Sequence, residues 1–339
     1  MQNIAVIGFG FMGITHTINI LKNPDLNLVA IVARNPDGVH KKLAEQAGNF
    51  YTGAITPAQL SKVNIYSSFD ECIRIEKIDA CIIAVHTHLH FEFSLKALKA
   101  GIHVFLEKPA SLNMEECTQM IALAEEKKLI LMVGHVVRFM PPYQKLKQWM
   151  EEEAYGALEF LSLTRVSGIP LWGNWVEKQK DFGSSGGALF DLLIHDIDYA
   201  VWVLGQPETI TATCLPGKLS NQDYVKAVWK YKSGVEVSID GGNIFHSTFP
   251  FHAAFTARFK NATVSYSSKS PENIAVSTDS ETTLVAAGDA NEGFSNELDY
   301  FISCIVHKKN PEQCTPQSAL TTLQICYQHI NHKTNEKKK

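Results

Sequence analysis

The sequence predicts an α/β fold in which a doubly wound parallel sheet is followed by an α+β domain with a large, mostly antiparallel open sheet. Two observations support this prediction. Up to about residue 135, short apolar runs alternate with helix-like segments, which is typical of parallel strands covered on both faces. After Pro141 and Pro142 the strand-like runs alternate between apolar and polar residues, which is typical of strands with one exposed face.

In the first part, apolar runs predict strands and periodic segments predict helices. The expected strands are residues 3–8, 28–33, 80–85, 104–107 and 130–134, and the expected helices are residues 12–22, 37–47, 88–100 and 113–128. Asn113, followed three residues later by Glu116, is a capping pattern for the start of the last helix. The alternation of strand and helix predicts a doubly wound parallel sheet.

The second part begins with an expected helix at residues 143–153. Strand-like segments follow at 158–166, 227–232, 235–240, 253–259 and 262–267, and Ser233-Gly234 marks a hairpin turn. A helix is expected around 189–204, and two more near 294–308 and 316–330. We expect a first domain at residues 1–136, a second at 137–332 and a solvated basic tail at 333–339.

The composition is that of an ordinary globular protein and argues against several classes of partner. The chain has 339 residues, of which 45% are hydrophobic and 19% charged, with a net charge of −4. No basic surface therefore favours nucleic acid or anionic lipid, and no apolar stretch approaches the ~20 residues of a membrane span. The seven cysteines are scattered without a CxxC pair, and no basic signal-peptide region precedes the first strand, so we expect a cytoplasmic protein.

A glycine motif lies between the first expected strand and the first expected helix. Gly8, Gly10 and Gly13 form the GxGxxG pattern, with Phe11 and Met12 inside it. The first glycine permits a tight turn, the second lets the backbone approach a pyrophosphate, and the third lets helix and strand pack closely. Free N–H groups at the helix start then bind the phosphates. We therefore expect dinucleotide binding.

The end of the second expected strand bears on the choice between NAD and NADP. NAD-binding domains usually place a carboxylate there to hold the ribose 2′-hydroxyl. This chain has Ala33 and Arg34 instead, and no carboxylate before Asp37. An arginine suits a 2′-phosphate, so the sequence favours NADP. If Arg34 instead stacks on the adenine or lies in solvent, NAD remains possible.

Three histidines, at positions 86, 88 and 90, alternate after Val85. On a strand this alternation would place three imidazoles on one face as a metal site. Here the strand passes into a helix, so the alternation does not persist, and no acidic or cysteine ligand stands beside them. We therefore expect no metal.

Two further motifs contain ionisable residues. Glu107-Lys108-Pro109 ends an expected strand, which is where ligands bind in an open α/β sheet. In residues 186–198, GGALFDLLIHDID, Asp191 and His195 are four residues apart and share one helix face. Taken alone, the lysine is equally well a surface residue in a turn, and the pair an ordinary i,i+4 pair on a solvated face.

Together these motifs resemble the Gfo/Idh/MocA oxidoreductase family, which includes glucose–fructose oxidoreductase and inositol dehydrogenase. The resemblance covers about residues 1–330 and rests on residues 8–13, 86–109 and 186–205, which keep the family's order and rough spacing. EKP followed by GGxxxDxxxHxxD is far more specific than the glycine motif. Ser185 stands where glycine is usual. The resemblance implies a Rossmann domain and a second domain whose open sheet is often used for dimer or tetramer contacts.

The resemblance also implies the roles of site residues. His195 becomes the acid/base for a substrate hydroxyl, Lys108 the cation beside the developing alkoxide, and Asp191 a residue that binds the substrate or orients the histidine. His90 matches a histidine of the nicotinamide-side loop. The cofactor-binding set is Gly8, Gly10, Phe11, Met12, Gly13, Arg34, Val85, His86, His90, Glu107 and Lys108. Asp196 and Asp198 are expected to be helix-face or structural residues, and the alternative for Asp198 is that it contributes to the site.

Arg138, Arg165 and Trp172 are further candidates for substrate binding beside Lys108, Asp191 and His195. The alternative is a surface ion pair for each of the two arginines and a place in the core for Trp172. The implied reaction is hydride transfer between NADP or NAD and a secondary alcohol or ketone of a cyclic polyol, sugar or nucleotide-sugar. Two alternatives stay open: a glycosidase that uses tightly bound NAD, and a non-catalytic cofactor-sensing regulator. A homo-oligomer is expected from the resemblance.

Overall fold

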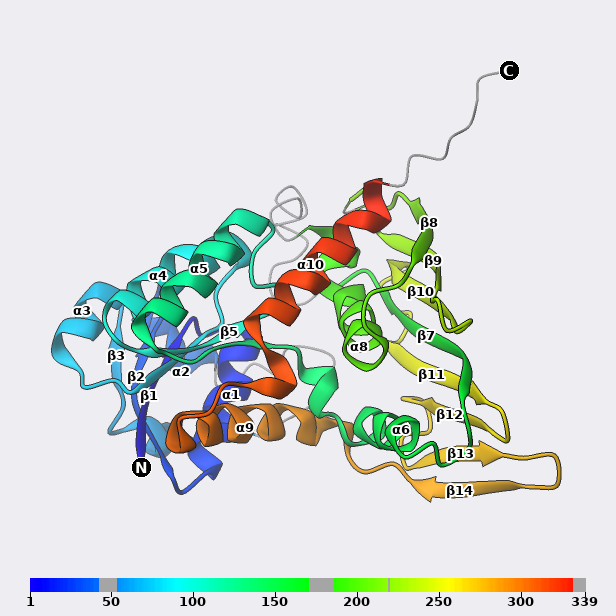
Figure 1. The fold of residues 1–339 in the computed structure, drawn as a ribbon. Helices are drawn as coiled ribbons and strands as arrows, with labels where there is room; N and C mark the ends of the chain where they lie inside the picture. Colours follow the sequence, from blue (N-terminus) through cyan, green and yellow to red (C-terminus); the bar gives the residue numbers. More distant parts are fainter. Residues whose placement is uncertain (43–53, 171–185, 219, 332–339) are drawn as a thin grey trace, which may run out of the picture. The chain divides into compact units, whose positions relative to one another are not determined.

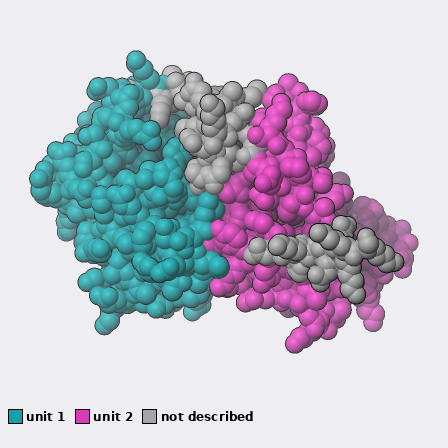
Figure 2. Space-filling view, turned by 90° about the horizontal axis from the view of Figure 1, so that it is seen from above, with its two compact units in different colours: residues 1–139, 291–320 teal, residues 140–290, 321–339 magenta. Residues whose placement is uncertain are grey.

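The computed structural model describes residues 1–42, 54–170, 186–218 and 220–331. Its contacts divide the chain into two compact units (Figures 1 and 2). Unit 1 consists of Met1–Phe139 and Asn291–Leu320, and unit 2 of Met140–Ala290 and the residues from Thr321 onward. The first break lies close to the expected boundary at residue 136. Residues 291–320, which we expected in the second domain, belong to unit 1 instead.

Unit 1 contains the strands and helices expected of a doubly wound sheet. They are β1 (Gln2–Ile7), α1 (Phe11–Lys22), β2 (Leu26–Val32), α2 (Val39–Lys42), β3 (Asn64–Tyr66), α3 (Phe69–Ile75), β4 (Ala80–Ile83), α4 (His90–Lys99), β5 (His103–Glu107), α5 (Met114–Lys127), β6 (Leu131–Gly134) and α9 (Gly293–His307). The expected helix at 37–47 appears as α2, and its remainder lies outside the described residues. Neither β3 nor α3 was expected.

The six strands of unit 1 form one sheet in the order β3-β2-β1-β4-β5-β6, and all neighbours are parallel. Figure 1 shows α4 and α5 side by side on one face, with α1 and α9 on the other. Because helices cover both faces, β4 and β6 are buried along their whole length. The strand order reverses between β1 and β4, and ligands bind at the carboxyl ends of the strands at such a reversal.

Unit 2 is built on a larger sheet. Its elements are α6 (Pro141–Glu151), β7 (Leu158–Gly168), α8 (Ile194–Leu204), β8 (Thr209–Leu215), β9 (Tyr224–Lys230), β10 (Glu236–Phe245), β11 (His252–Phe259), β12 (Thr263–Ser267), β13 (Asn273–Ser277) and β14 (Thr282–Ala286). The last helix, α10 (Pro316–Asn331), begins in unit 1 and ends in unit 2. The strand order is β14-β13-β12-β11-β7-β10-β9-β8.

The sheet of unit 2 is mostly antiparallel, as expected. Only β7 and β10 pair in parallel among its described strands. The predicted hairpin between β9 and β10 is confirmed, with Gly234 at φ +88° in its turn. Burial alternates along β9 and β11, and α8 packs against β7 and β10. One face of the sheet is therefore covered and the other faces outward. The strands β8, β13 and β14 were not expected.

Candidate active site

The glycine loop between β1 and α1 has the shape that a pyrophosphate needs. Gly8 has φ +95°, and a Cβ there would lie 2.4 Å from the carbonyl oxygen of Ala84. A Cβ on Gly13 would lie 2.0 Å from the carbonyl oxygen of Gly8, so both positions admit only glycine. Gly10, the N-cap of α1, differs because a Cβ there would meet no atom within 4 Å. The loop is therefore tightly packed at Gly8 and Gly13 and open at Gly10.

The start of α1 leaves this open side ready for an anion. No side chain caps the helix, and no acidic residue stands in its first turn. Phe11 and Met12, the first two helical residues, are partly exposed. The N–H groups of a first helical turn and the positive end of the helix dipole favour phosphate at this point. The residues present therefore fit the diphosphate of a dinucleotide.

The carboxyl end of β2 places an arginine where the adenosine ribose binds in such domains. Ala33 is buried and donates its N–H to Tyr66, while Arg34 is exposed. Asp37, the first acidic residue after β2, is also exposed, in a turn that Asn35 caps. Along the chain, Asp37 is thus the first carboxylate after Arg34.

The three alternating histidines after β4 differ in burial and do not form one set on a common face. His86 and His88 are exposed, and their rings stack with centroids 6.1 Å apart. His90 is buried, with Nδ1 2.8 Å from the carbonyl oxygen of Pro109 and Nε2 3.1 Å from that of Val85. Burial lowers the pKa of His90. The ring of His90 therefore ties the loop after β4 to the loop after β5 by contacts to the backbone.

In the EKP segment, the partly exposed Lys108 stands between two buried residues, Glu107 and Pro109. Glu107 is the last residue of β5 and is 6% exposed, and Pro109 is also buried. Lys108 between them is partly exposed. Glu107 Oε1 lies 2.6 Å from Nε2 of His16 on α1. This arrangement places Lys108 at the carboxyl end of β5, the neighbour of β4, and β4 is one of the two strands at the reversal in strand order.

In unit 2 the DxxxH segment departs from regular α-helix. Residues Leu189–Leu193 form a π-helical turn that runs directly into α8. Such turns are rare and occur often at functional sites. Asp191 lies within the turn and His195 just after it, and both are partly exposed. Gly186 and Gly187, with φ +82° and +74°, lead the chain into this turn.

The other acidic residues of this helix, Asp196 and Asp198, are buried and hydrogen-bonded within the protein. Asp196 pairs with Arg165, with Nε 2.7 Å from Oδ2, and Asp198 accepts a hydrogen bond from Thr322 at 2.9 Å. Burial raises the pKa of Asp196, and the adjoining guanidinium opposes the rise. The helix therefore directs Asp196 and Asp198 into the core and leaves Asp191 and His195 partly exposed.

The arginines and the tryptophan named as substrate candidates have different surroundings. Arg165 is 4% exposed and fixed by both carboxylate oxygens of Asp196, so the structure gives it a place in the core of unit 2 rather than at a surface. Arg138 is 1% exposed and donates to the carbonyl oxygen of Gln313 at 2.9 Å. Trp172 lies outside the described residues.

Two residues near the site escaped sequence reasoning. His16 lies in the second turn of α1, and Glu297 lies on α9, nearly 200 residues after Glu107. His16 could have been found because a histidine is conspicuous in a helix of mostly apolar or small residues directly after the glycine motif. No local pattern marks Glu297, because its partners come from α1 and β5.

The comparisons with known proteins agree with this architecture. A family model described as an oxidoreductase family with an NAD-binding Rossmann fold matches residues 2–135. The C-terminal domain model of the same GFO/IDH/MocA family matches residues 143–266. The two models together span most of the chain.

Individual relatives belong to the same group. A myo-inositol 2-dehydrogenase of Thermotoga maritima is 29% identical over 246 residues, which are 70% of this chain and 68% of the relative. The structure of a UDP-N-acetylglucosamine 3-dehydrogenase from Acidithiobacillus ferrooxidans matches with a TM-score of 0.78 and 20% identity, covering 96% of each chain. A levoglucosan dehydrogenase in complex with NADH and levoglucosan matches with a TM-score of 0.82 and 19% identity, covering 97% of this chain and 96% of the other.

Among the described helices, none has the length and apolar character needed to cross a bilayer. The glycine loop, the EKP segment and the DxxxH helix occur in the expected order on the expected fold, and two family models cover both parts of the chain. The chain therefore belongs to the GFO/IDH/MocA family of NAD-dependent oxidoreductases.

Proposed function

We propose that the chain transfers a hydride between NAD(P) and a secondary alcohol or ketone of a cyclic polyol, sugar or nucleotide-sugar. The observation that carries this proposal is the selective exposure of two residues on one helix. Asp196 and Asp198 are fully buried and hydrogen-bonded, whereas Asp191 and His195 stay partly exposed beside a π-helical turn. A carboxylate and an imidazole kept toward solvent in this way suit proton transfer to and from a bound substrate.

Oxidation of a secondary alcohol removes a hydride and a proton. The nicotinamide accepts the hydride, so the chain must bind the hydroxyl and take its proton. We assign the proton to His195, because an imidazole exchanges a proton near neutral pH. Asp191 orients this imidazole or binds the hydroxyl. Lys108 stabilises the negative charge on the substrate oxygen, and in reduction His195 returns the proton.

The cofactor and the substrate class have separate support. The exposed Arg34, two residues after the end of β2 and with no carboxylate between it and Asp37, favours NADP. Three similar proteins are named for dehydrogenation of inositol, a nucleotide-sugar and levoglucosan, and all three compounds carry secondary hydroxyls on a ring. We therefore place the substrate in this chemical class. We also propose that the outward face of the unit 2 sheet serves for contacts in a homo-oligomer.

A substrate panel tests the proposal. Cyclic polyols, sugars and nucleotide-sugars are each mixed with the protein and NAD⁺ or NADP⁺, and formation of the reduced nicotinamide is followed by its absorbance. We expect turnover that requires added cofactor, with at least one member of the panel. Cofactor retained through purification, with glycoside cleavage that needs none added, would favour a glycosidase. Cofactor binding without oxidation or reduction of any member would favour a regulator.

A further inference from the structure

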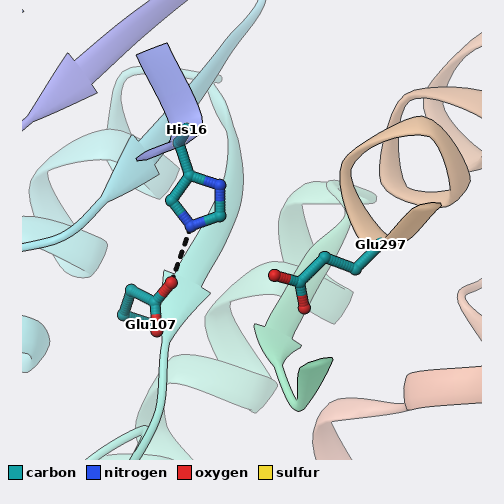
Figure 3. A group of neighbouring side chains, drawn as sticks. All are labelled: His16, Glu107 and Glu297. Carbon is teal, nitrogen blue, oxygen red and sulfur yellow. Dashed lines mark hydrogen bonds and ion pairs between the residues drawn. The ribbon is translucent and has the colours of Figure 1, made fainter. Parts of the chain in front are cut away.

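A buried polar cluster lies inside unit 1, behind the EKP segment. It consists of His16 from α1, Glu107 from the end of β5 and Glu297 from α9 (Figure 3). Their exposed fractions are 0%, 6% and 0%, and one nitrogen or oxygen atom from each lies within 4.8 Å of the others. The side chains around them include the aromatic ring of Phe105, whose centroid is 5.0 Å from that of His16. Three ionisable groups thus share a site that excludes water.

The closest pair in the cluster is joined through a proton. His16 Nε2 and Glu107 Oε1 are 2.6 Å apart, which is the separation of a short hydrogen bond. Two ligands of one tetrahedral zinc ion, each about 2.0–2.1 Å from the metal, would lie about 3.3 Å apart. The geometry is therefore that of an imidazole N–H donating to a carboxylate, and not that of two ligands around an ion.

Among the described residues, Glu297 forms no ion pair of its own, in contrast to His16 and Glu107. Figure 3 shows its carboxyl group directed toward the His16–Glu107 pair. Both of its oxygens are buried, and neither has a hydrogen-bond partner within the part of the chain that the structure describes. If Glu297 were ionised, two carboxylates would share at most one imidazolium in a dry interior, which is the costly arrangement for buried charge. Burial and the neighbouring Glu107 both raise the pKa of Glu297 well above its ordinary value.

We propose that Glu297 is held as a neutral carboxylic acid and that, together with His16, it is a positioning residue for Glu107 and Lys108. His16 belongs to the helix that starts at the glycine loop, and Glu107 immediately precedes Lys108. The cluster therefore fixes the position of the phosphate-binding end of α1 relative to the lysine after β5. The third member of the cluster, Glu297, comes from α9. This role rests on the proposed function, because it gives Lys108 a task in catalysis.

The protonation state is tested by infrared spectroscopy of the whole protein at neutral pH. We expect a carboxylic acid C=O band that is absent from Glu297→Gln and present in Glu312→Gln, which alters an exposed glutamate of the same unit. An unchanged spectrum in Glu297→Gln would show that Glu297 is ionised and would overturn the proposal. One equivalent of metal in the wild-type protein that Glu297→Gln lacks would overturn it as well.

The positioning role is tested by comparing two replacements at the same place. Glutamine resembles a neutral glutamic acid in size and hydrogen bonding, so Glu297→Gln should keep the cofactor Kd and kcat within about twofold. Glu297→Ala leaves a hole behind Glu107, and small displacements of a site can cost up to about 10²-fold in kcat. We expect such a loss in Glu297→Ala with an unchanged circular dichroism spectrum. Equal activity of Glu297→Ala and wild type would contradict positioning.

These outcomes are separable from a failure of the proposed function. If Lys108 takes no part in turnover, Lys108→Met is as active as wild type, while the infrared band of Glu297 remains. If the cluster proposal fails, the band is missing, while Lys108→Met still loses turnover. If Glu297→Ala does not fold, the infrared comparison with Glu297→Gln and the kcat of Glu297→Gln still decide, since strong loss in the glutamine variant would contradict a neutral acid.

Discussion

His16 Nε2 lies 2.6 Å from Glu107 Oε1, and this hydrogen bond joins α1 to the last residue of β5. Both side chains are buried. Because α1 begins at the glycine loop and Lys108 follows Glu107, one bond connects the phosphate-binding and lysine sides of unit 1. Glu297 faces this bond, and its protonation state has a thermodynamic consequence.

The stability of the protein should depend on pH through Glu297. Its pKa is raised in the folded chain, so between the unfolded value of 4.5 and the folded value the native state binds one more proton than the unfolded state. Stability conferred at low pH is therefore lost as pH rises, by about 1.4 kcal/mol per pH unit in that window. Glu297→Gln removes this dependence. In urea unfolding above pH 4.5, the free energy of unfolding of Glu297→Gln should rise relative to that of wild type as the pH rises. The control Glu312→Gln should differ from wild type by the same amount at every pH. The same pH-independent difference in Glu297→Gln would contradict the neutral acid.

Two glycines of the same loop should respond differently to alanine. Gly13→Ala places a Cβ 2.0 Å from a backbone oxygen and should lower the melting temperature. Gly10→Ala places it in open space, so the fold should be kept while the methyl group meets the incoming pyrophosphate. We expect the cofactor Kd of Gly10→Ala to rise about tenfold or more, or ~1.4 kcal/mol. Fluorescence titration with NADH and NADPH measures this, and unchanged affinity would mean that the diphosphate binds elsewhere.

Arg34→Ala should separate the two cofactors. A charge-assisted contact to the 2′-phosphate contributes about 1.5–3 kcal/mol, so NADPH affinity should fall by about 10- to 100-fold with little change for NADH. Arg74→Ala, which removes another exposed arginine of unit 1, is the matched control and should change neither. Equal weakening of NADPH and NADH would indicate stacking on the adenine ring.

Arg165 and Arg258 form ion pairs of very different burial on adjacent strands. Arg165→Met leaves Asp196 buried without its partner, which typically costs about 3–5 kcal/mol. Arg258→Met breaks an exposed pair with Glu159 and should cost at most about 1 kcal/mol. Urea denaturation of the two variants measures the difference. Similar small losses in both, together with a raised KM in Arg165→Met, would return Arg165 to the substrate site.

The sequence predicts most of the parallel sheet because its central strands are continuous apolar runs between clear helices. The strand β3 escapes this reasoning, since Asn64–Tyr66 is short and only partly buried. At the sheet edge, β14 escapes it because most of its residues are exposed and show no alternation of burial. The helix α9 is visible as a helix, but only tertiary packing against α1 shows that it belongs to unit 1.

Some residues of the candidate site can be identified from the sequence, and others become visible only in the fold. Gly8, Lys108 and His195 stand in short motifs with fixed spacing, so the sequence identifies them. The cluster of His16, Glu107 and Glu297 is assembled from three distant segments, so no spacing reveals it. The scarcity of arginine in this chain makes Arg165 a candidate for recognition or for a surface ion pair, and only the fold shows its buried ion pair with Asp196.

Hydride transfer assisted by Lys108 and His195 is tested most directly by measuring cofactor Kd and kcat together for Lys108→Met and His195→Ala. We expect both variants to keep the cofactor Kd, while kcat falls by about 10²–10⁴-fold for a lost acid/base and about 10²–10³-fold for a lost charge contact. The exposed Lys99 and His307 provide controls, and Lys99→Met and His307→Ala should retain full turnover. Wild-type turnover in Lys108→Met or in His195→Ala would contradict the proposed reaction site.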